Sequence, residues 1–421
     1  MYLKIAGNAS VALLVLQMFM GGGDHLPDNK NSNQPTQELE CYVDAPGNAG
    51  ITQDMVEKGT NEMPCASSEE VQICSHNGCW DAKWQYKELV TKAEVLISQL
   101  LVSHHYDSIN NFLTLYRNYK ATPDHTLKEF FPKYNPPIQP YKHTCVGLAI
   151  EVMKCLKSLE TDFPGIEQSI MVVSCEENVE KMVEYTTLHQ RPPEFPIVTE
   201  KDHVMVACHL QLDGRPGLFL SDLGYHVARL VTVMVDRGHP HTGWFTQASK
   251  PRYIKEFNYQ FNQENQNYVE WHERETKADK VILQRSLVYV ERAYLSAIEF
   301  TEKRNLVWDM KNLLARGSNG ALLAGINFVS NRKETKVTVS YMGPDGVKLR
   351  NKLNVEVFLN LAEIPENVVQ DVKECNEQLN MEEGMLMSIL NELAVIMSNR
   401  NFVSDMLDLN ELIRELTIIK K

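Results

Sequence analysis

The chain has 421 residues, of which 43% are hydrophobic and 23% charged, with 21 Gly and 18 Pro. This composition is typical of a folded globular protein and excludes collagen-like, wholly disordered and purely coiled-coil chains. The 42 Lys and Arg residues against 55 Asp and Glu residues give a net charge of −13, which disfavours nucleic acid and anionic lipid surfaces as partners. At roughly 150 residues per domain, the length suggests two or three domains.

The N-terminal segment 1–20 has one early lysine, Lys4, and then an apolar run from Val11 to Met20. It resembles the core of a signal peptide, but it is too short to span a bilayer, so we expect no stable membrane insertion. The one Asn-x-Ser/Thr sequon, at Asn8, lies inside this segment, and the nine cysteines are an odd number. A cleaved signal and a plain apolar N-terminus both stay open, with a cytoplasmic protein slightly favoured over a secreted one.

Residues 21–84 form an acidic leader that contains Cys41, Cys65, Cys74 and Cys79. In an oxidising compartment these four cysteines could form two disulfides, with three alternative pairings, whereas in the cytosol they would be free thiols. His76 lies between Cys74 and Cys79, but the leader has no second Cys-x-x-Cys pair, so no zinc site is predicted. Gly78-Cys79-Trp80 looks like the surroundings of a transglutaminase nucleophile, but no helical pattern follows it, which favours a structural role.

Helical periodicity begins after Trp84 and predicts two helices, around Leu89–Leu101 and Ile109–Tyr116. The proline-rich stretch 134–141 is predicted to be a loop. A third, amphipathic helix is predicted to begin at about Cys145, because Leu148, Val152, Leu156 and Leu159 recur on one face.

Strand-like runs dominate residues 165–300 and predict an antiparallel sheet, followed by a hairpin at 336–349 around a Met-Gly-Pro-Asp-Gly turn. Residues 368–419 show helical spacing of Leu, Ile and Met and predict two or three helices that pack on their own domain. The expected fold class is therefore α+β. It combines a helical N-terminal subdomain with the Cys145 helix, an antiparallel barrel-like sheet, and a C-terminal helical region.

The residues that carry chemistry are Cys145, His203 and Asp222. A cysteine in the first turn of a helix lies where the unpaired amide groups and the helix dipole favour an anion, so Cys145 is a candidate nucleophile. His203 begins an apolar strand, Asp213-Gly214 is a hairpin turn, and Asp222 ends the second strand. His203 and Asp222 then lie at the same end of this hairpin on neighbouring strands about 4.8 Å apart, close enough for a hydrogen bond.

The chain combines a helix that begins at Cys, a strand that begins at His, an Asp-Gly turn and a strand that ends in Asp-Leu-Gly-Tyr. The order of these elements resembles the arylamine N-acetyltransferase family. This family belongs to the transglutaminase-like and papain-like cysteine superfamily. The resemblance covers roughly residues 85–330 and is best at 203–225. It implies that Cys145 is the nucleophile, that His203 is the base and that Asp222 orients it. It also implies acyl transfer from acetyl-CoA or another acyl-CoA, used as a co-substrate, to an amine or hydroxyl, with a backbone N–H at the helix start stabilising the oxyanion.

Two positions depart from the family pattern. No Arg-Gly-Gly precedes Cys145, and Gly224-Tyr225-His226 stands where the family has Gly-Phe-Gly. Three functions follow as hypotheses: an acyltransferase, an amidase of the transglutaminase or papain type, and a catalytically inactive relative used for binding or structure.

The expected organisation divides the chain into 1–20, 21–84, a catalytic core at 85–330, and a hairpin with C-terminal helices at 331–421. No metal site is expected, because His226, His239 and His241 lack a carboxylate to complete a set and fit a solvated loop better. The Met-rich run from Met381 to Met397 is expected to pack in the core. The expected partners are a small-molecule acyl donor and acceptor. Their identities and the oligomeric state stay open, and no cofactor-binding residues are assigned.

Overall fold

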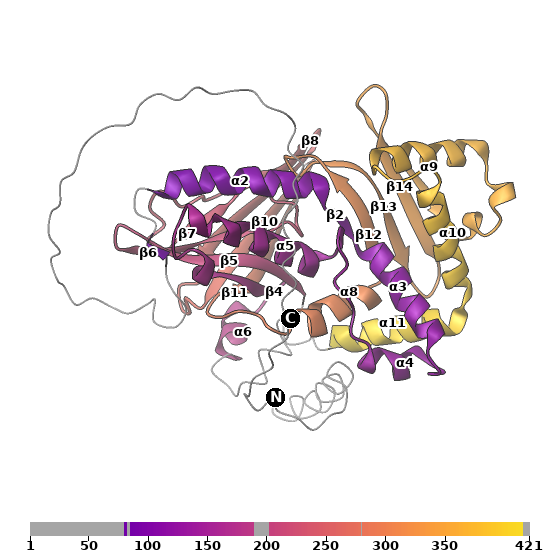
Figure 1. Cartoon of the computed structure of the whole chain (residues 1–421), viewed down its shortest axis with the longest axis horizontal. Coiled ribbons are helices and arrows are strands. Elements are labelled where there is room, and N and C mark those ends of the chain that lie inside the picture. The colour runs from indigo at the N-terminus through magenta and orange to yellow at the C-terminus, as the bar shows by residue number, and fades with distance from the viewer. Residues whose placement is uncertain (1–79, 82–84, 189–201, 279, 416–421) are drawn as a thin grey trace.

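The computed structural model describes residues 80–81, 85–188, 202–278 and 280–415. The predictions on the apolar segment 1–20 and on Cys41, Cys65, Cys74 and Cys79 lie outside the described residues. The α+β fold class is confirmed: two antiparallel-rich sheets stand side by side, and helices cover both (Figure 1).

The first sheet curls into a half-barrel in the order β7-β6-β5-β4-β11-β10-β9-β8, with β1 paired in parallel to β5. Because the sheet curls, β7 contacts β9, and its concave face buries an apolar core that includes Phe257 and Trp271. The strands are β1 (Trp80–Asp81), β4 (Ile170–Glu176), β5 (His203–Leu212), β6 (Arg215–Ser221), β7 (Val231–Met234), β8 (Phe245–Lys250), β9 (Tyr253–Phe261), β10 (Tyr268–Lys277) and β11 (Lys280–Tyr289). This confirms the predicted antiparallel sheet in residues 165–300.

Two helices, α2 (Tyr86–Ser103) and α5 (Cys145–Lys157), cover the convex face of this sheet (Figure 1). The predicted apolar face of α5 is buried there, with Leu148, Val152 and Leu156 against β4 and β5. Two short turns, η3 (Ser158–Thr161) and η4 (Glu167–Ser169), follow α5, and the short helix α6 (Met182–Leu188) packs on β10 and β11 in a separate cluster. The helix predicted to begin at Cys145 does begin there, so its N-terminus faces the end of the sheet where β5 starts.

The second sheet has the order β15-β14-β13-β12-β2-β3. Its strands are β2 (His105–Asp107), β3 (Lys142–His143), β12 (Met310–Arg316), β13 (Leu322–Ser330), β14 (Thr335–Met342) and β15 (Lys348–Asn354). The predicted hairpin is β14–β15, and Gly346 in its turn has a φ of +73°, a conformation that favours glycine. Strands β12 and β13 were not predicted. The expected boundary between residues 330 and 331 falls between β13 and β14, which pair with each other.

Helices on the second sheet enclose a core in which Phe112, Phe328 and Phe402 meet. These helices and turns are α3 (Ser108–Ala121), α4 (Leu127–Phe130), η2 (Phe131–Lys133), η5 (Ile298–Glu302, a π-helical turn), α8 (Lys303–Val307), η6 (Val355–Phe358), η7 (Leu361–Glu363), α9 (Glu366–Gln378), α10 (Met385–Ser398) and α11 (Arg400–Glu415). The C-terminal helices are thus confirmed, and Met381, Met387 and Met397 lie against this core as expected. The expectation was wrong for Met385, which begins α10 on its outer side and is 41% exposed.

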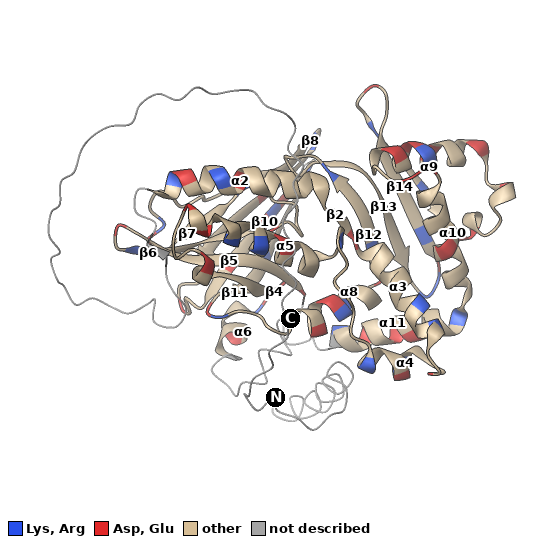
Figure 2. Ribbon diagram, viewed as in Figure 1, with Lys and Arg blue, Asp and Glu red and all other residues tan. Residues whose placement is uncertain are grey.

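The charged side chains of both signs are interspersed on helices such as α2 and α9 (Figure 2). Among the helices that the structure describes, none combines the length and apolar character needed to cross a membrane.

Candidate active site

Cys145 is the first residue of α5, and its side chain is 4% exposed. Thr144 caps the helix: its hydroxyl accepts a hydrogen bond from the Val146 N–H at 3.3 Å. The thiol therefore lies at the positive end of the helix dipole, where a negative sulfur is stabilised. The Val146 N–H already has a partner in this cap, and an oxyanion donor among the backbone N–H groups at the helix start stays a prediction.

His203 and Asp222 meet at the open end of the β5–β6 hairpin. Asp213 and Gly214 form the predicted turn, both with positive φ, and this turn sets the strands in register. His203 opens β5, Asp222 directly follows β6, and His203 Nε2 lies 3.0 Å from Asp222 Oδ2. Both side chains are 4% exposed.

All three predicted residues converge on Gly224. A methyl group added at this glycine would lie 2.6 Å from His203 Cε1, 2.9 Å from Cys145 Cβ and 3.3 Å from Asp222 Oδ1. His203 is also close enough to Cys145 for a hydrogen bond between imidazole and thiol. The structure thus brings together residues that are up to 77 positions apart in the sequence (222 − 145).

Burial works against a charged His203, but the Asp222 carboxylate and the Cys145 sulfur outweigh it and raise the pKa of His203 well above 6.5. The imidazole is therefore favoured in its protonated form at neutral pH. A protonated imidazole between a carboxylate and a sulfur is the arrangement in which a thiolate can be held as an ion pair.

Asn305 and Glu302 were not predicted, yet they border the nucleophile. Asn305, on α8, directs its amide Nδ2 toward Cys145 Sγ at 3.4 Å. Glu302, at the end of the π-helical turn η5, accepts hydrogen bonds from the Thr144 hydroxyl and from Asn111 Nδ2. Its burial raises the pKa of Glu302 to about 7, although both hydrogen bonds act to lower it. No local pattern in residues 298–307 marks them as part of a site, whereas a Thr directly before a predicted helix is a usable signal for the cap.

Neighbouring residues outside the triad also contact Asp222 and His203. The Tyr225 N–H donates to Asp222 Oδ1 at 3.0 Å, and the Tyr225 hydroxyl donates to Glu177 at 2.6 Å. The Tyr225 ring meets the His203 ring edge to face, with centroids 4.9 Å apart. Asp202, next to His203, forms a buried ion pair with Arg304 at 2.6 Å. These contacts restrict the orientation of both triad side chains.

His226 occupies the position at which the resembled family has its second glycine. Its φ of +60° lies in the left-handed region that favours glycine. Among the described residues, no three His, Cys, Asp or Glu side chains gather as a metal would require.

No protein-family model and no curated protein sequence matches this chain. Among solved structures, an arylamine N-acetyltransferase from Nocardia farcinica is similar, with a TM-score of 0.34 and 12% sequence identity, over 72% of this chain and 87% of that one. This is a distant relationship at the level of the fold.

Proposed function

We propose that the protein is an acyltransferase in which Cys145 is the nucleophile, His203 the general acid and base, and Asp222 the residue that orients His203. One observation supports this above all. A cysteine at a helix N-terminus, a histidine and an aspartate meet around Gly224, where an added methyl group would lie 2.6 Å from His203 Cε1, 2.9 Å from Cys145 Cβ and 3.3 Å from Asp222 Oδ1. A Cys, a His or an Asp alone is common in protein cores, but this order of contacts is what nucleophilic catalysis requires.

In the first step, the Cys145 thiolate attacks the carbonyl carbon of the acyl donor, and a new carbon–sulfur bond forms. When the donor is a thioester, its own carbon–sulfur bond breaks. The leaving thiolate then takes the proton from the His203 imidazolium. The products are a free thiol, acylated Cys145 and neutral His203.

In the second step, an amine or hydroxyl attacks the acyl-Cys145 carbonyl and gives its proton to His203. The bond between the acyl carbon and Cys145 Sγ breaks, which restores the thiolate and the imidazolium. Asp222 accepts a hydrogen bond from His203 throughout and fixes the ring in the orientation that both proton transfers need.

Asn305 is the side chain best placed to stabilise the oxyanion. Its amide nitrogen carries two N–H donors and lies 3.4 Å from Cys145 Sγ, so one donor can interact with sulfur while the other faces a carbonyl oxygen bound there. The role resembles that of a side-chain amide in an oxyanion hole, where removal of one donor lowers kcat about 10²- to 10³-fold.

The burial of the site supports a slender acyl donor. Cys145 and His203 are 4% and 3% exposed, so neither residue offers an open surface to a bulky donor. A small acyl thioester such as an acyl-CoA, used as a co-substrate and not tightly bound, suits such a site better than an extended peptide. The proposed acceptor is a small amine or hydroxyl.

The test is acylation of Cys145 in the full chain. We expect incubation with acetyl-CoA or with p-nitrophenyl acetate to place one acetyl group on Cys145, as peptide mass spectrometry would show. His203→Gln should slow this acylation by about 10²-fold or more, because the base is lost. His209→Gln is the matched control, since His209 lies on the same strand and bonds the Val290 carbonyl at 2.7 Å instead.

Two results would overturn the proposal. One is the absence of acetyl from Cys145 with both donors. The other is equal acetylation rates in wild type and His203→Gln. Either result would favour the inactive relative used for binding. Acylation by a glutamine-containing peptide but by neither small donor would favour the amidase.

A further inference from the structure

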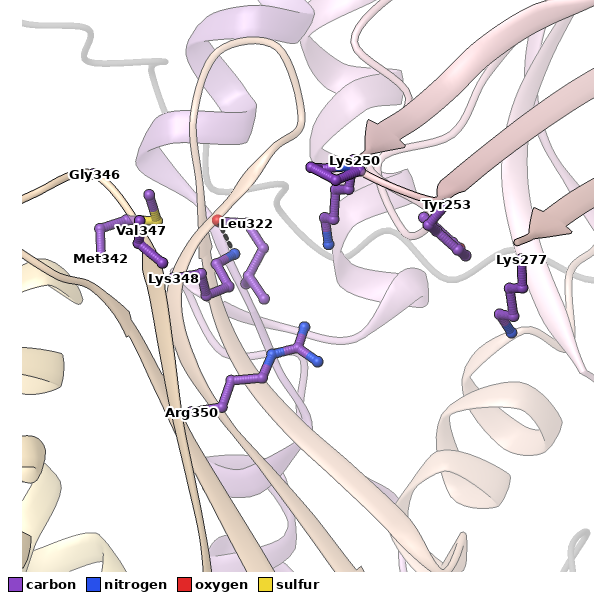
Figure 3. Close-up of a pocket in the computed structure, with 10 residues that line it drawn as sticks. Lys250, Tyr253, Lys277, Leu322, Met342, Gly346, Val347, Lys348 and Arg350 are labelled. Atoms are coloured by element: carbon purple, nitrogen blue, oxygen red, sulfur yellow. Dashed lines mark hydrogen bonds between the residues drawn. The ribbon is translucent and has the colours of Figure 1, made fainter. Parts of the chain in front are cut away.

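An open cavity of about 850 Å³ lies between the turn that joins β8 and β9 and the turn that joins β14 and β15 (Figure 3), and no triad residue lines it. Its walls therefore come from both sheets. The lining residues are Lys250, Pro251, Tyr253, Lys277, Leu322, Met342, Gly346, Val347, Lys348 and Arg350, none of which is acidic.

Four cations line this cavity, and three of them lack a carboxylate partner among the described residues. Lys277 pairs with Glu275 at 2.6 Å. Lys250 and Arg350 form no ion pair in the described part of the chain, and Lys348 donates to the Leu322 carbonyl instead. In Figure 3, Lys250, Lys348 and Arg350 direct their charged ends toward the space between the two sheets.

A fifth cation, Arg316, adds to the same positive field. Its guanidinium donates to the Gly320 carbonyl at 3.1 Å, while its Nε is buried without a hydrogen-bond partner. Burial, and then repulsion by Lys250, Arg350 and Arg316, lowers the pKa of Lys348 to about 8. Burial followed by Arg350 and Arg316 likewise lowers the pKa of Lys250. These cations repel one another, and no carboxylate among the described residues forms an ion pair with Lys250, Lys348 or Arg350.

We propose that this cavity binds the phosphate groups of a phosphorylated small molecule, held by Lys250, Lys348 and Arg350. Arginine offers paired donors to phosphate oxygens and lysine supplies point charges, so a ligand with two or more phosphates would balance the cluster. Tyr253, Leu322 and Met342 give the wall an aromatic and apolar part, which suits an organic group attached to the phosphates. This proposal is independent of whether Cys145 is catalytic.

The overall charge and the extent of the cluster favour a small ligand over a nucleic acid. Lys250, Lys348 and Arg350 line a single cavity, and the net negative charge of the whole chain would repel a long phosphate backbone. A compact polyphosphate contacts the cavity alone.

The experiment is calorimetric titration of the full chain with inorganic pyrophosphate, ATP and CoA. We expect one-to-one binding of pyrophosphate, weakened at least tenfold in Lys348→Gln/Arg350→Gln. The control Lys87→Gln/Lys120→Gln removes the same charge from exposed positions on α2 and α3 and should bind as wild type does. Tighter binding of ATP or CoA than of pyrophosphate would show that the organic part also occupies the cavity. Equal affinities for the three compounds would show that the phosphate groups alone are bound.

Thermal unfolding guards against a folding defect. Lys348→Gln/Arg350→Gln should unfold at the same temperature as wild type or higher, because it removes repulsion between like charges. The proposal fails if none of the three probes binds at about 1 mM, or if the cavity variant and the control variant bind pyrophosphate equally. The same titrations on Cys145→Ala should match wild type, which separates this site from the outcome at the triad.

Discussion

The absence of a side chain at Gly224 is as important to the site as the side chains around this residue. A Cβ at this position would press on His203, Cys145 and Asp222 at 2.6 to 3.3 Å. The atoms concerned cannot move aside as the flexible end of a long side chain could. The triad can therefore close only because residue 224 is glycine.

Gly224→Ala is expected to lower the rate of Cys145 acylation by at least 10²-fold, because displacement of a catalytic group by about 1 Å costs that much. The measurement is the acetylation rate by mass spectrometry. Gly317→Ala is the comparison, because Gly317 has no positive φ and the nearest atom to an added carbon, Asn319 Oδ1, lies at an ordinary contact distance of 3.4 Å. Similar acetylation rates in Gly224→Ala and wild type would contradict the packing around the triad.

Among single residues, sequence patterns identified those that act through local structure. Cys145 was found because it opens an amphipathic helix, and His203 and Asp222 because a two-residue turn brings the ends of a hairpin together. Asn305 and Glu302 could not be found in this way. They reach Cys145 and Thr144 from a segment about 160 residues further on, and only the tertiary fold relates the two.

At the scale of elements, the site depends on how the π-helical turn η5 and α8 meet the start of α5. Glu302 ends the turn and accepts a hydrogen bond from Thr144, the residue that caps α5. Asn305 follows one turn later on α8. Because π-helical turns insert an extra residue, they shift the following side chains around the helix axis, and here both reach the nucleophile helix.

Glu302→Gln is expected to change how stability depends on pH. Burial raises the pKa of Glu302 from 4.5 to about 7, so the folded protein holds a proton that the unfolded chain releases. The associated stability is complete below pH 4.5 and is lost as the pH rises to about 7. A shift of this size corresponds to about 3 kcal/mol, since each pKa unit is worth about 1.4 kcal/mol.

The measurement compares the free energies of unfolding of wild type and Glu302→Gln from pH 4.5 to 8. Wild type should lose up to about 3 kcal/mol relative to the variant across this range, because glutamine resembles the protonated acid and does not titrate. A constant difference between the two proteins would show that Glu302 titrates normally.

The order of elements was predicted more completely than their pairing. Helical periodicity and turn residues marked α2, α3, α5, the β5–β6 and β14–β15 hairpins and the C-terminal helices. Strands β12 and β13 lacked such a signal, and the short strands β2 and β3 join their sheet only through pairing with β12 and with each other. Such pairing depends on distant residues, which a pattern along one segment does not encode.

For the whole molecule, the second core supports the site although it lies beside the first sheet. Phe300, Leu306 and Val307, on η5 and α8, belong to the same cluster as Phe112 on α3 and Phe402 on α11. The elements that carry Glu302 and Asn305 are therefore anchored in this core. The C-terminal helices contribute to it as well, since α11 packs on α8.

Phe112→Ala is expected to destabilise the protein by about 3–5 kcal/mol, the usual cost of truncating a fully buried Phe. Phe112 lies 6.5 Å from Phe328 and 5.9 Å from Phe402 between ring centroids, so its loss removes packing from a helix, a strand and α11 together. Denaturant unfolding measures the change. Leu283→Ala, at a residue 69% exposed, should cost little, and equal losses in the two variants would contradict this role of the second core.

The most direct test of the whole account is the pH dependence of iodoacetamide alkylation, measured at each cysteine by mass spectrometry in wild type and in His203→Ala. We predict that Cys145 reacts at about pH 6, where an ordinary thiol of pKa about 8.5 is nearly inert, and that His203→Ala abolishes this reaction. Half-buried Cys155 and buried Cys208 are the internal comparisons. If Cys145 is unreactive, or follows the same pH profile as Cys155 in both proteins, no thiolate–imidazolium pair exists and the acyl-transfer mechanism is wrong.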